Sequence, residues 1–158
     1  MSALTPRSAR SASSRSGVRK LPDRHRDSRA LLGDRVRRAH WNLTGRNFRS
    51  VHLELDKVVD IARNHADVVA ERAVTIGVNP DGRVRTVADS SRLGQLDAGH
   101  LQDDKVVAAM TDLLAEVVQR FRAHIAATDD TDLVSQDLLI AATRDLEEQH
   151  WMFEVQRH

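Results

Sequence analysis

Apolar residues recur at steps of three and four along most of the chain, which predicts long amphipathic helices. The first is expected over 23–43 and the second over about 50–76. A third is predicted over about 103–127 and a fourth over about 132–155. The expected buried stripe of the second helix comprises Val51, Leu55, Val58, Val59, Ala62, Ala66, Val69, Ala70 and Ala73. No strand-like alternation competes with this pattern.

Glycine and asparagine mark where the predicted helices end. Residues 42–47 separate the first two helices, and Gly77 stops the second. Residues 78–102 form a long connection, with one helical turn expected around 87–92. Two helices, a long crossover and two tightly joined helices are typical of a ferritin-like four-helix bundle. We therefore expect an all-α fold.

The amino-acid composition restricts both the fold class and the kinds of metal ligand. The chain has 158 residues, 41% of them hydrophobic and only 3% aromatic, which suits a single helical domain with a sizeable core. Without cysteine there are no disulfides or thiolate ligands, so nitrogen and oxygen atoms must hold any metal. No apolar run approaches the roughly 20 residues that span a bilayer.

Charge divides the chain into a basic tail and an acidic body. The formal net charge is +1, but residues 1–26 carry seven basic residues against one acid, so the remainder is acidic. We expect a disordered tail over 1–22 and the bundle domain over 23–158. An Arg- and Ser-rich start without acids is also typical of an organelle transit peptide, although no clear apolar face accompanies the charges.

The basic tail is a candidate DNA-binding segment. Its cations can neutralise phosphates without reading sequence. Residues 1–20 contain no aromatic side chain on which bases could stack, so binding should be non-specific and strongly salt-dependent. The alternative is a solubilising or assembly-guiding tail. The candidate residues are Arg7, Arg10, Arg15, Arg19 and Lys20.

Histidines and carboxylates gather around the break between the first two helices. His40 precedes the break. His52 and Asp56 are four residues apart on the next helix, so they share one face; Asp67 and Glu71 repeat that spacing later on. Any one of these residues alone is typical of ordinary surface or core positions. Together they predict a sulfur-free site that suits iron, manganese or zinc.

Helix geometry separates the two halves of this site. His52 and Asp67 are 15 residues apart on one helix, or about 22 Å at the helical rise per residue. Metal–ligand bonds are only about 2 Å long, so the two ends cannot hold one ion within a single subunit. Antiparallel packing of this helix in a two-fold dimer would bring the ends together twice. The site therefore predicts a homo-oligomer.

Residues 40–52, around the break, read HWNLTGRNFRSVH, and Asp67 and Glu71 follow on the next helix. This motif and its spacing resemble those of the Dps family, the DNA-binding proteins of starved cells. Residues 141–152, AATRDLEEQHWM, resemble the family's fourth helix. The similarity extends over about 25–156. Arg46 departs from the small residue or proline often found there, which affects the loop and removes no ligand.

The resemblance assigns roles to the site residues. It implies that His40 and His52 come from one subunit and that Asp67 and Glu71 come from its dimer mate. Asp56 would be an additional ligand or lie just behind the metal. Trp41 would lie beside the site.

The resemblance also implies a function. Family members oxidise Fe(II), two ions per site and preferably with hydrogen peroxide, and store ferric mineral inside a hollow dodecamer. The resemblance therefore implies that the protein protects DNA in the bacterial cytoplasm, in association with the nucleoid. Asp137 matches a family position in the pore through which iron enters, and Asp132 is a second candidate. The alternative for both acids is charge complementarity at a helix N-terminus.

Two other functions are compatible with the sequence. The protein could compact the nucleoid while its metal site is structural or occupied by zinc. A different ferritin-like enzyme would need two Glu-x-x-His pairs within one bundle. Glu147 and His150 make one such pair, and no second copy is suitably placed.

Overall fold

The computed structural model describes residues 35–81, 99–129 and 132–157. The elements in chain order are a helical segment over 35–42, strand β1 (Leu43–Thr44), helix α3 (Phe48–Thr75), strand β2 (Leu101–Gln102), helix α5 (Asp103–Thr128) and helix α6 (Leu133–Glu154). The predicted helix ends lie within two residues of these bounds wherever the chain is described. The expected start of the first helix, the turn around 87–92 and the tail over 1–22 fall outside the described residues.

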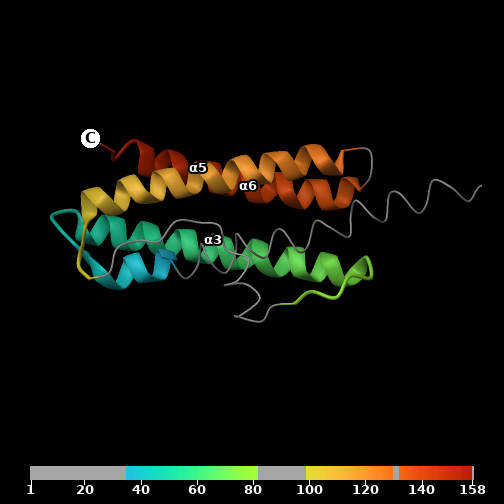
Figure 1. The fold of residues 1–158 in the computed structure, drawn as a ribbon, viewed down its shortest axis with the longest axis horizontal. Helices are drawn as coiled ribbons and strands as arrows, with labels where there is room; N and C mark the ends of the chain where they lie inside the picture. Colours follow the sequence, from blue (N-terminus) through green and yellow to red (C-terminus); the bar gives the residue numbers. More distant parts are fainter. Residues whose placement is uncertain (1–34, 82–98, 130–131, 158) are drawn as a thin grey trace, which may run out of the picture.

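The helices lie side by side along the long axis of the molecule (Figure 1). α5 and α6 form an antiparallel hairpin, and α3 packs mainly against α6. The helical segment 35–42 lies at the end of the bundle where α3 and α5 begin. This arrangement confirms the predicted all-α, ferritin-like bundle.

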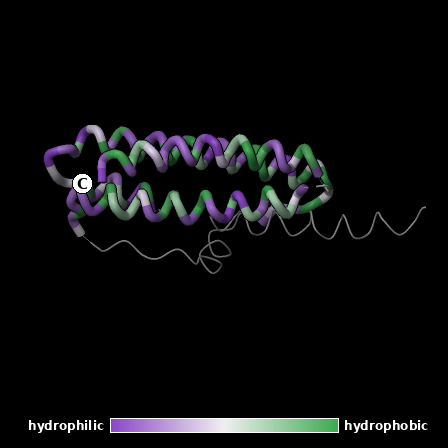
Figure 2. Tube along the Cα trace, turned by 90° about the horizontal axis from the view of Figure 1, so that it is seen from above, coloured by the Kyte–Doolittle hydropathy of each residue, from purple (hydrophilic) through white to green (hydrophobic). Residues whose placement is uncertain are grey.

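Each described helix has one apolar and one polar face, seen as alternating green and purple along its path (Figure 2). The predicted stripe of α3 is buried as expected, except that Val69 and Ala70 are only half-buried. Phe153 is the largest fully buried side chain among the described residues, and Leu55 and Met110 are buried with it in one continuous core. None of the described helices is long and apolar enough to cross a membrane.

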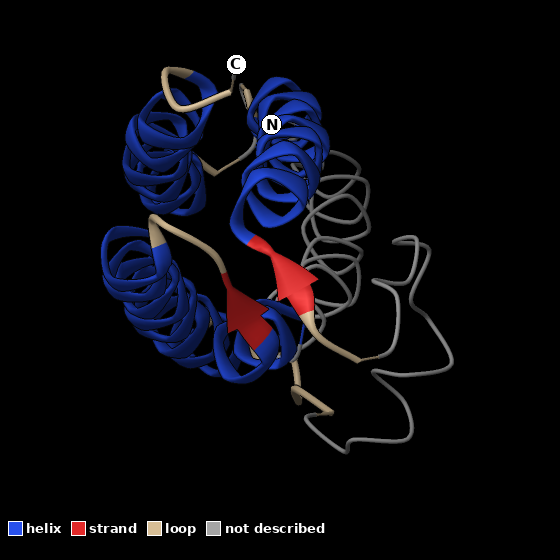
Figure 3. Cartoon of the chain, turned by 90° about the vertical axis from the view of Figure 1, so that its left-hand side faces the viewer, coloured by secondary structure: helices blue, strands red, loops and turns tan. Residues whose placement is uncertain are grey.

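Two short strands, which the sequence did not predict, lie side by side at one end of the bundle (Figure 3). β1 pairs with β2 in parallel, with Leu43 opposite Leu101 and Thr44 opposite Gln102. The Thr44 hydroxyl also donates a hydrogen bond to the Leu101 carbonyl at 3.3 Å. The pairing connects the break before α3 directly to the start of α5.

Candidate metal site

Two histidine rings stack across the break between the helical segment 35–42 and α3. The ring centroids of His40 and His52 are 3.6 Å apart, with an angle of 28° between the planes. Asp56 lies one turn after His52, and its Oδ1 is 2.8 Å from His40 Nε2. Potential ligand atoms of the three residues all lie within 4.8 Å of one another. In the part of the chain that the structure describes, this is the one such group of three.

Two ring nitrogens in this group are buried without a hydrogen-bond partner: His40 Nε2 and His52 Nδ1. Asp56 approaches His40 Nε2 closely, but the two groups lack hydrogen-bond geometry. Leaving a buried polar atom unsatisfied costs about 1–3 kcal/mol. A metal ion bound by neutral imidazoles and the half-exposed Asp56 carboxylate would offset that cost. The donor set is therefore suited to a cation.

The break itself is held in place by the start of α5. Gly45 has φ +132°, a conformation that L side chains rarely adopt. A Cβ at this position would lie 2.3 Å from the Asp103 carboxylate carbon. The same carboxylate accepts a hydrogen bond from the Asn47 backbone N–H at 2.7 Å. These contacts set the path of the chain between His40 and His52.

The predicted carboxylate half of the site lies elsewhere on α3. Asp67 and Glu71 are exposed, one turn apart, and they are not part of the His40–His52 group. Their helical distance from His52 is about 22 Å for Asp67 and more for Glu71. The interface site expected from the sequence therefore stays a prediction. Trp41 follows His40 directly, and 72% of its surface is exposed.

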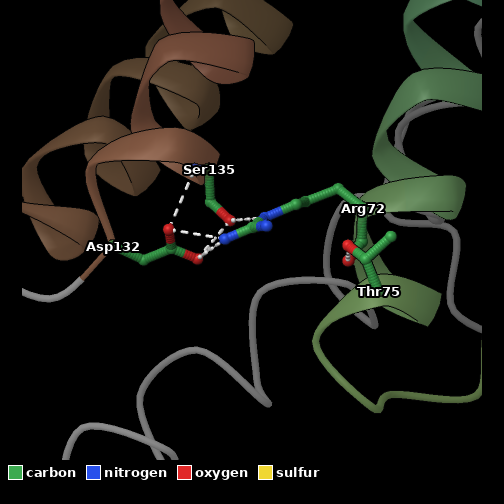
Figure 4. A network of polar contacts seen from close by, with 4 residues as sticks. All are labelled: Arg72, Thr75, Asp132 and Ser135. Carbon is green, nitrogen blue, oxygen red and sulfur yellow. Dashed lines mark hydrogen bonds and ion pairs between the residues drawn. The ribbon is translucent and has the colours of Figure 1, made fainter.

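Of the two pore candidates, Asp132 has partners within the subunit (Figure 4). Its carboxylate accepts two hydrogen bonds from Arg72 Nη2, at 2.8 and 3.0 Å, and one from the Ser135 backbone N–H at 3.2 Å. The Ser135 hydroxyl donates to it as well, at 2.5 Å, and Arg72 Nε donates to that hydroxyl at 3.1 Å. Asp132 is thus the N-cap of α6 and connects it to α3. Asp137, five residues further along, is exposed.

These contacts also govern the ionisation of Asp132. Burial alone would raise its pKa, because desolvation penalises the charged carboxylate. The hydrogen bonds from Ser135 and Arg72 and the charge of Arg72 outweigh burial, so the pKa of Asp132 is held below its ordinary value. Asp132 therefore stays charged at neutral pH.

Sequence reasoning missed the long-range contacts of three residues in the bundle. The sequence shows Asp103 as an acid at a predicted helix start, but it does not indicate that Asp103 contacts Asn47, 56 positions earlier. The partnership of Arg72 with Asp132 likewise joins residues far apart in the chain. The tail candidates, Arg7 to Lys20, lie outside the described residues.

His65 is the third such residue. Its Nε2 lies 2.7 Å from Asp145 Oδ2 and gives a second polar contact between α3 and α6. Local periodicity contains no signal for such long-range pairs.

The fold and this donor set define a ferritin-like protein, and the family described as "Ferritin-like domain" matches residues 34–157. The DNA protection during starvation protein of Mycolicibacterium smegmatis is 38% identical over an alignment of 122 residues, and the match covers 73% of this chain and 63% of that relative. The chain thus spans less than two thirds of that relative's length.

Solved structures agree with the sequence match. Mycobacterium smegmatis Dps, in its tetragonal form, superposes with a TM-score of 0.87 at 30% identity, covering 99% of this chain and 94% of that one. Dps from Microbacterium arborescens, in its high iron form, gives 0.85 at 28% identity, covering 98% of each chain. The chain belongs to the Dps family of ferritin-like proteins.

Proposed function

We propose that this protein oxidises Fe(II) and stores the ferric product, at sites that two copies of the chain complete together. The observation that carries the proposal is the stacked pair His40 and His52, with two buried ring nitrogens that lack hydrogen-bond partners beside the Asp56 carboxylate. The solved Microbacterium arborescens Dps in its high iron form supports iron as the metal. Iron is here the substrate and the stored cargo.

The second half of the site comes from another copy of the chain. Asp67 and Glu71 are exposed on α3, where a neighbouring subunit can approach them. Antiparallel packing of two α3 helices across a two-fold axis would place His52 of each copy near Asp67 of the other. Each dimer would then contain two identical sites, and six dimers would form the dodecamer that the family resemblance implies.

The ligand chemistry suits oxidation of iron pairs by hydrogen peroxide. Imidazoles and carboxylates accept both Fe(II) and Fe(III). Two Fe(II) ions each lose one electron, and one peroxide takes up both electrons and two protons to give two molecules of water. This stoichiometry releases no hydroxyl radical, so the reaction would protect DNA. We expect Trp41, the residue after His40, to take up a stray oxidising equivalent.

We propose that iron enters the shell between acidic side chains at the start of α6. Exposed Asp137 from three subunits would make a negative funnel that concentrates cations. Asp132 is the weaker candidate, because Arg72 already pairs with its carboxylate. Asp137→Asn should slow mineral growth while leaving peroxide consumption at low iron loading unchanged; equal growth rates would exclude the funnel.

We propose that the basic tail adds to DNA protection by binding DNA directly. The basic tail, with Arg7, Arg10, Arg15, Arg19 and Lys20, would bind DNA without sequence preference, and twelve copies on one particle would add avidity. The particle would then act in the bacterial cytoplasm, next to the nucleoid.

Particle mass and iron oxidation, measured on one preparation, test the proposal. The purified protein is loaded with Fe(II) without oxygen and then mixed with hydrogen peroxide or with oxygen. We expect a dodecamer that forms ferric iron faster with peroxide. A stable monomer with full activity would overturn the shared site. Tight zinc binding without iron oxidation would favour the alternative, a nucleoid-compacting protein with a structural metal.

A further inference from the structure

We propose that Asp103, at the start of α5, is a positioning residue for the histidine pair. Asp103 belongs to neither predicted half of the metal site. Its carboxylate acts instead on the backbone that carries His40 and His52. The effect of Asp103 on metal binding rests on the proposed iron site. The contacts that Asp103 makes with the backbone do not depend on any metal.

The first observation is that α3 begins without a cap of its own. The side chain of its N-cap residue, Asn47, makes no capping hydrogen bond, and the first turn of α3 contains no acid. Asp103 compensates from another element: its Oδ2 accepts a hydrogen bond from the Asn47 N–H at 2.7 Å. A carboxylate at a helix N-terminus also complements the partial positive charge there.

The second observation is that one carboxylate lies between two helix starts. While Oδ2 of Asp103 accepts from Asn47, its Oδ1 accepts from the Asp104 N–H of α5 at 3.0 Å. The two helices are thereby fixed relative to each other at this end of the bundle. The pairing of β1 with β2 brings the same two segments together (Figure 3).

The third observation is that the break is shaped around this carboxylate. Gly45 adopts φ +132° directly against Asp103, where any Cβ would lie within 2.6 Å of the carboxylate atoms. Such a separation is far below van der Waals contact, so no larger residue fits without displacing one of the two. The carboxylate and the glycine therefore define a single path for the break.

That path determines how the histidines meet. His40 lies three residues before β1, and His52 lies in the first turns of α3. Phe48, the first residue of α3, also contacts the His52 ring, with a centroid distance of 5.0 Å. If the start of α3 shifts or frays, the His40–His52 stacking changes with it. Asp103 thus acts through Asn47, without touching the metal.

Cobalt(II) binding to the assembled protein tests this role, because the visible absorption of Co(II) reports its ligands. We expect Asp103→Ala to weaken Co(II) binding by about tenfold or more, as is typical when a group that orients metal ligands is lost. Asp103→Asn keeps an oxygen that can accept from Asn47 and should stay within about threefold of the unaltered protein. His52→Ala identifies the signal that belongs to the histidine pair.

Asp104→Ala is the matched control. Asp104 is exposed, and among the described residues its Oδ1 accepts only from the next amide, that of Lys105, at 2.7 Å. Its removal should leave the Co(II) affinity and spectrum unchanged. An Asp103→Ala protein that is less heat-stable but has unchanged Co(II) affinity would overturn the positioning role, because the residue would then only stabilise the fold. Equal impairment of Asp103→Asn and Asp103→Ala would overturn it as well, in favour of a purely electrostatic effect.

A second variant keeps the test decisive if Asp103→Ala does not assemble. Gly45→Ala introduces a Cβ against the Asp103 carboxylate and must therefore weaken Co(II) binding too. Unchanged affinity in that variant would overturn the proposal. Absence of Co(II) binding by the unaltered protein would instead overturn the metal site, and with it the proposed function, so the two failures are distinguishable.

Discussion

The ring of His40 stacks on that of His52 at a centroid distance of 3.6 Å, although a non-helical break separates the two residues along the chain. Each ring has a buried nitrogen without a hydrogen-bond partner, and Asp56 lies beside them. One subunit therefore brings together the two histidines of the proposed metal site. The carboxylates Asp67 and Glu71 lie far along α3, outside this group.

Complementation between two inactive variants tests whether subunits share the site. His52→Ala and Asp67→Ala should each abolish rapid peroxide-driven iron oxidation, because each removes a ligand from every site. In a mixed dimer, however, one site loses both ligands and the other keeps both. When equal amounts of the two variants co-assemble at random, about half of the dimers are mixed, so about a quarter of all sites should be restored. The initial rate of ferric iron formation measures the recovery.

The control mixes the same variants after separate assembly, when subunits no longer exchange. That mixture should remain inactive. Full inactivity of the co-assembled particle would show that each site draws its ligands from a single chain. Unchanged rates in either variant alone would exclude that residue as a ligand.

Acid should remove the stabilisation that Asp132 provides. Its pKa is depressed in the folded protein, so its contribution is complete above the unfolded value near 3.8 and is lost as the pH falls through the lower folded value. Asp132→Ala should lower the free energy of unfolding by about 2 kcal/mol at pH 7, through loss of an N-cap and charged hydrogen bonds. This difference should shrink below about pH 3.8.

Urea unfolding across that pH range provides the measurement for Asp132. Glu148→Gln, at an exposed position of α6, is the control and should change stability little at any pH. A difference for Asp132→Ala that is independent of pH would mean that its charge does not stabilise the fold.

Truncation of two neighbouring side chains on α6 should lower the free energy of unfolding by very different amounts. Leu139 is buried in the core, with 3% of its surface exposed, whereas 48% of Ile140 is exposed. Leu139→Ala should destabilise the subunit by about 2–5 kcal/mol, since it removes transfer energy and leaves a cavity. Ile140→Ala should cost under about 1 kcal/mol. Denaturant unfolding under conditions that dissociate the assembly compares the two; equal losses would contradict this packing of α6.

Removing the tail should weaken DNA binding. A chain that starts at Leu21 lacks Arg7, Arg10, Arg15, Arg19 and Lys20. Its gel shift at low salt should require more protein than that of the full chain, and the salt dependence should be shallower, because fewer counterions are released. Equal binding by both proteins would exclude the tail and favour a solubilising or assembly role for it.

Most of the fold follows from local pattern. The ends of α3, α5 and α6 lie within two residues of their predicted places, because a buried stripe at helical spacing is a signal carried by each segment alone. β1 and β2 have no such signal, since two residues cannot show a periodicity. Their pairing depends on the helices that bring them together.

The site was predictable only in part for a similar reason. His52 and Asp56 were recognised by spacing within one helix, and the stacking of His40 on His52 required the fold of the break. The hydrogen bond between Asp103 and Asn47 joins residues 56 positions apart and leaves no mark on local sequence. The distance between His52 and Asp67, which exceeds any metal–ligand bond, indicates a second subunit, as does the resemblance to the Dps family.

The pairing of β1 with β2 also has a consequence for the order of events during synthesis. Thr44 and Leu101 are 57 positions apart, so a ribosome completes all of α3 before the partner strand exists. Contacts over such a separation close a long loop and form late in folding. We therefore expect the nascent chain to lack a fixed histidine pair until α5 has emerged. Iron capture would then begin only on chains whose second half has been made.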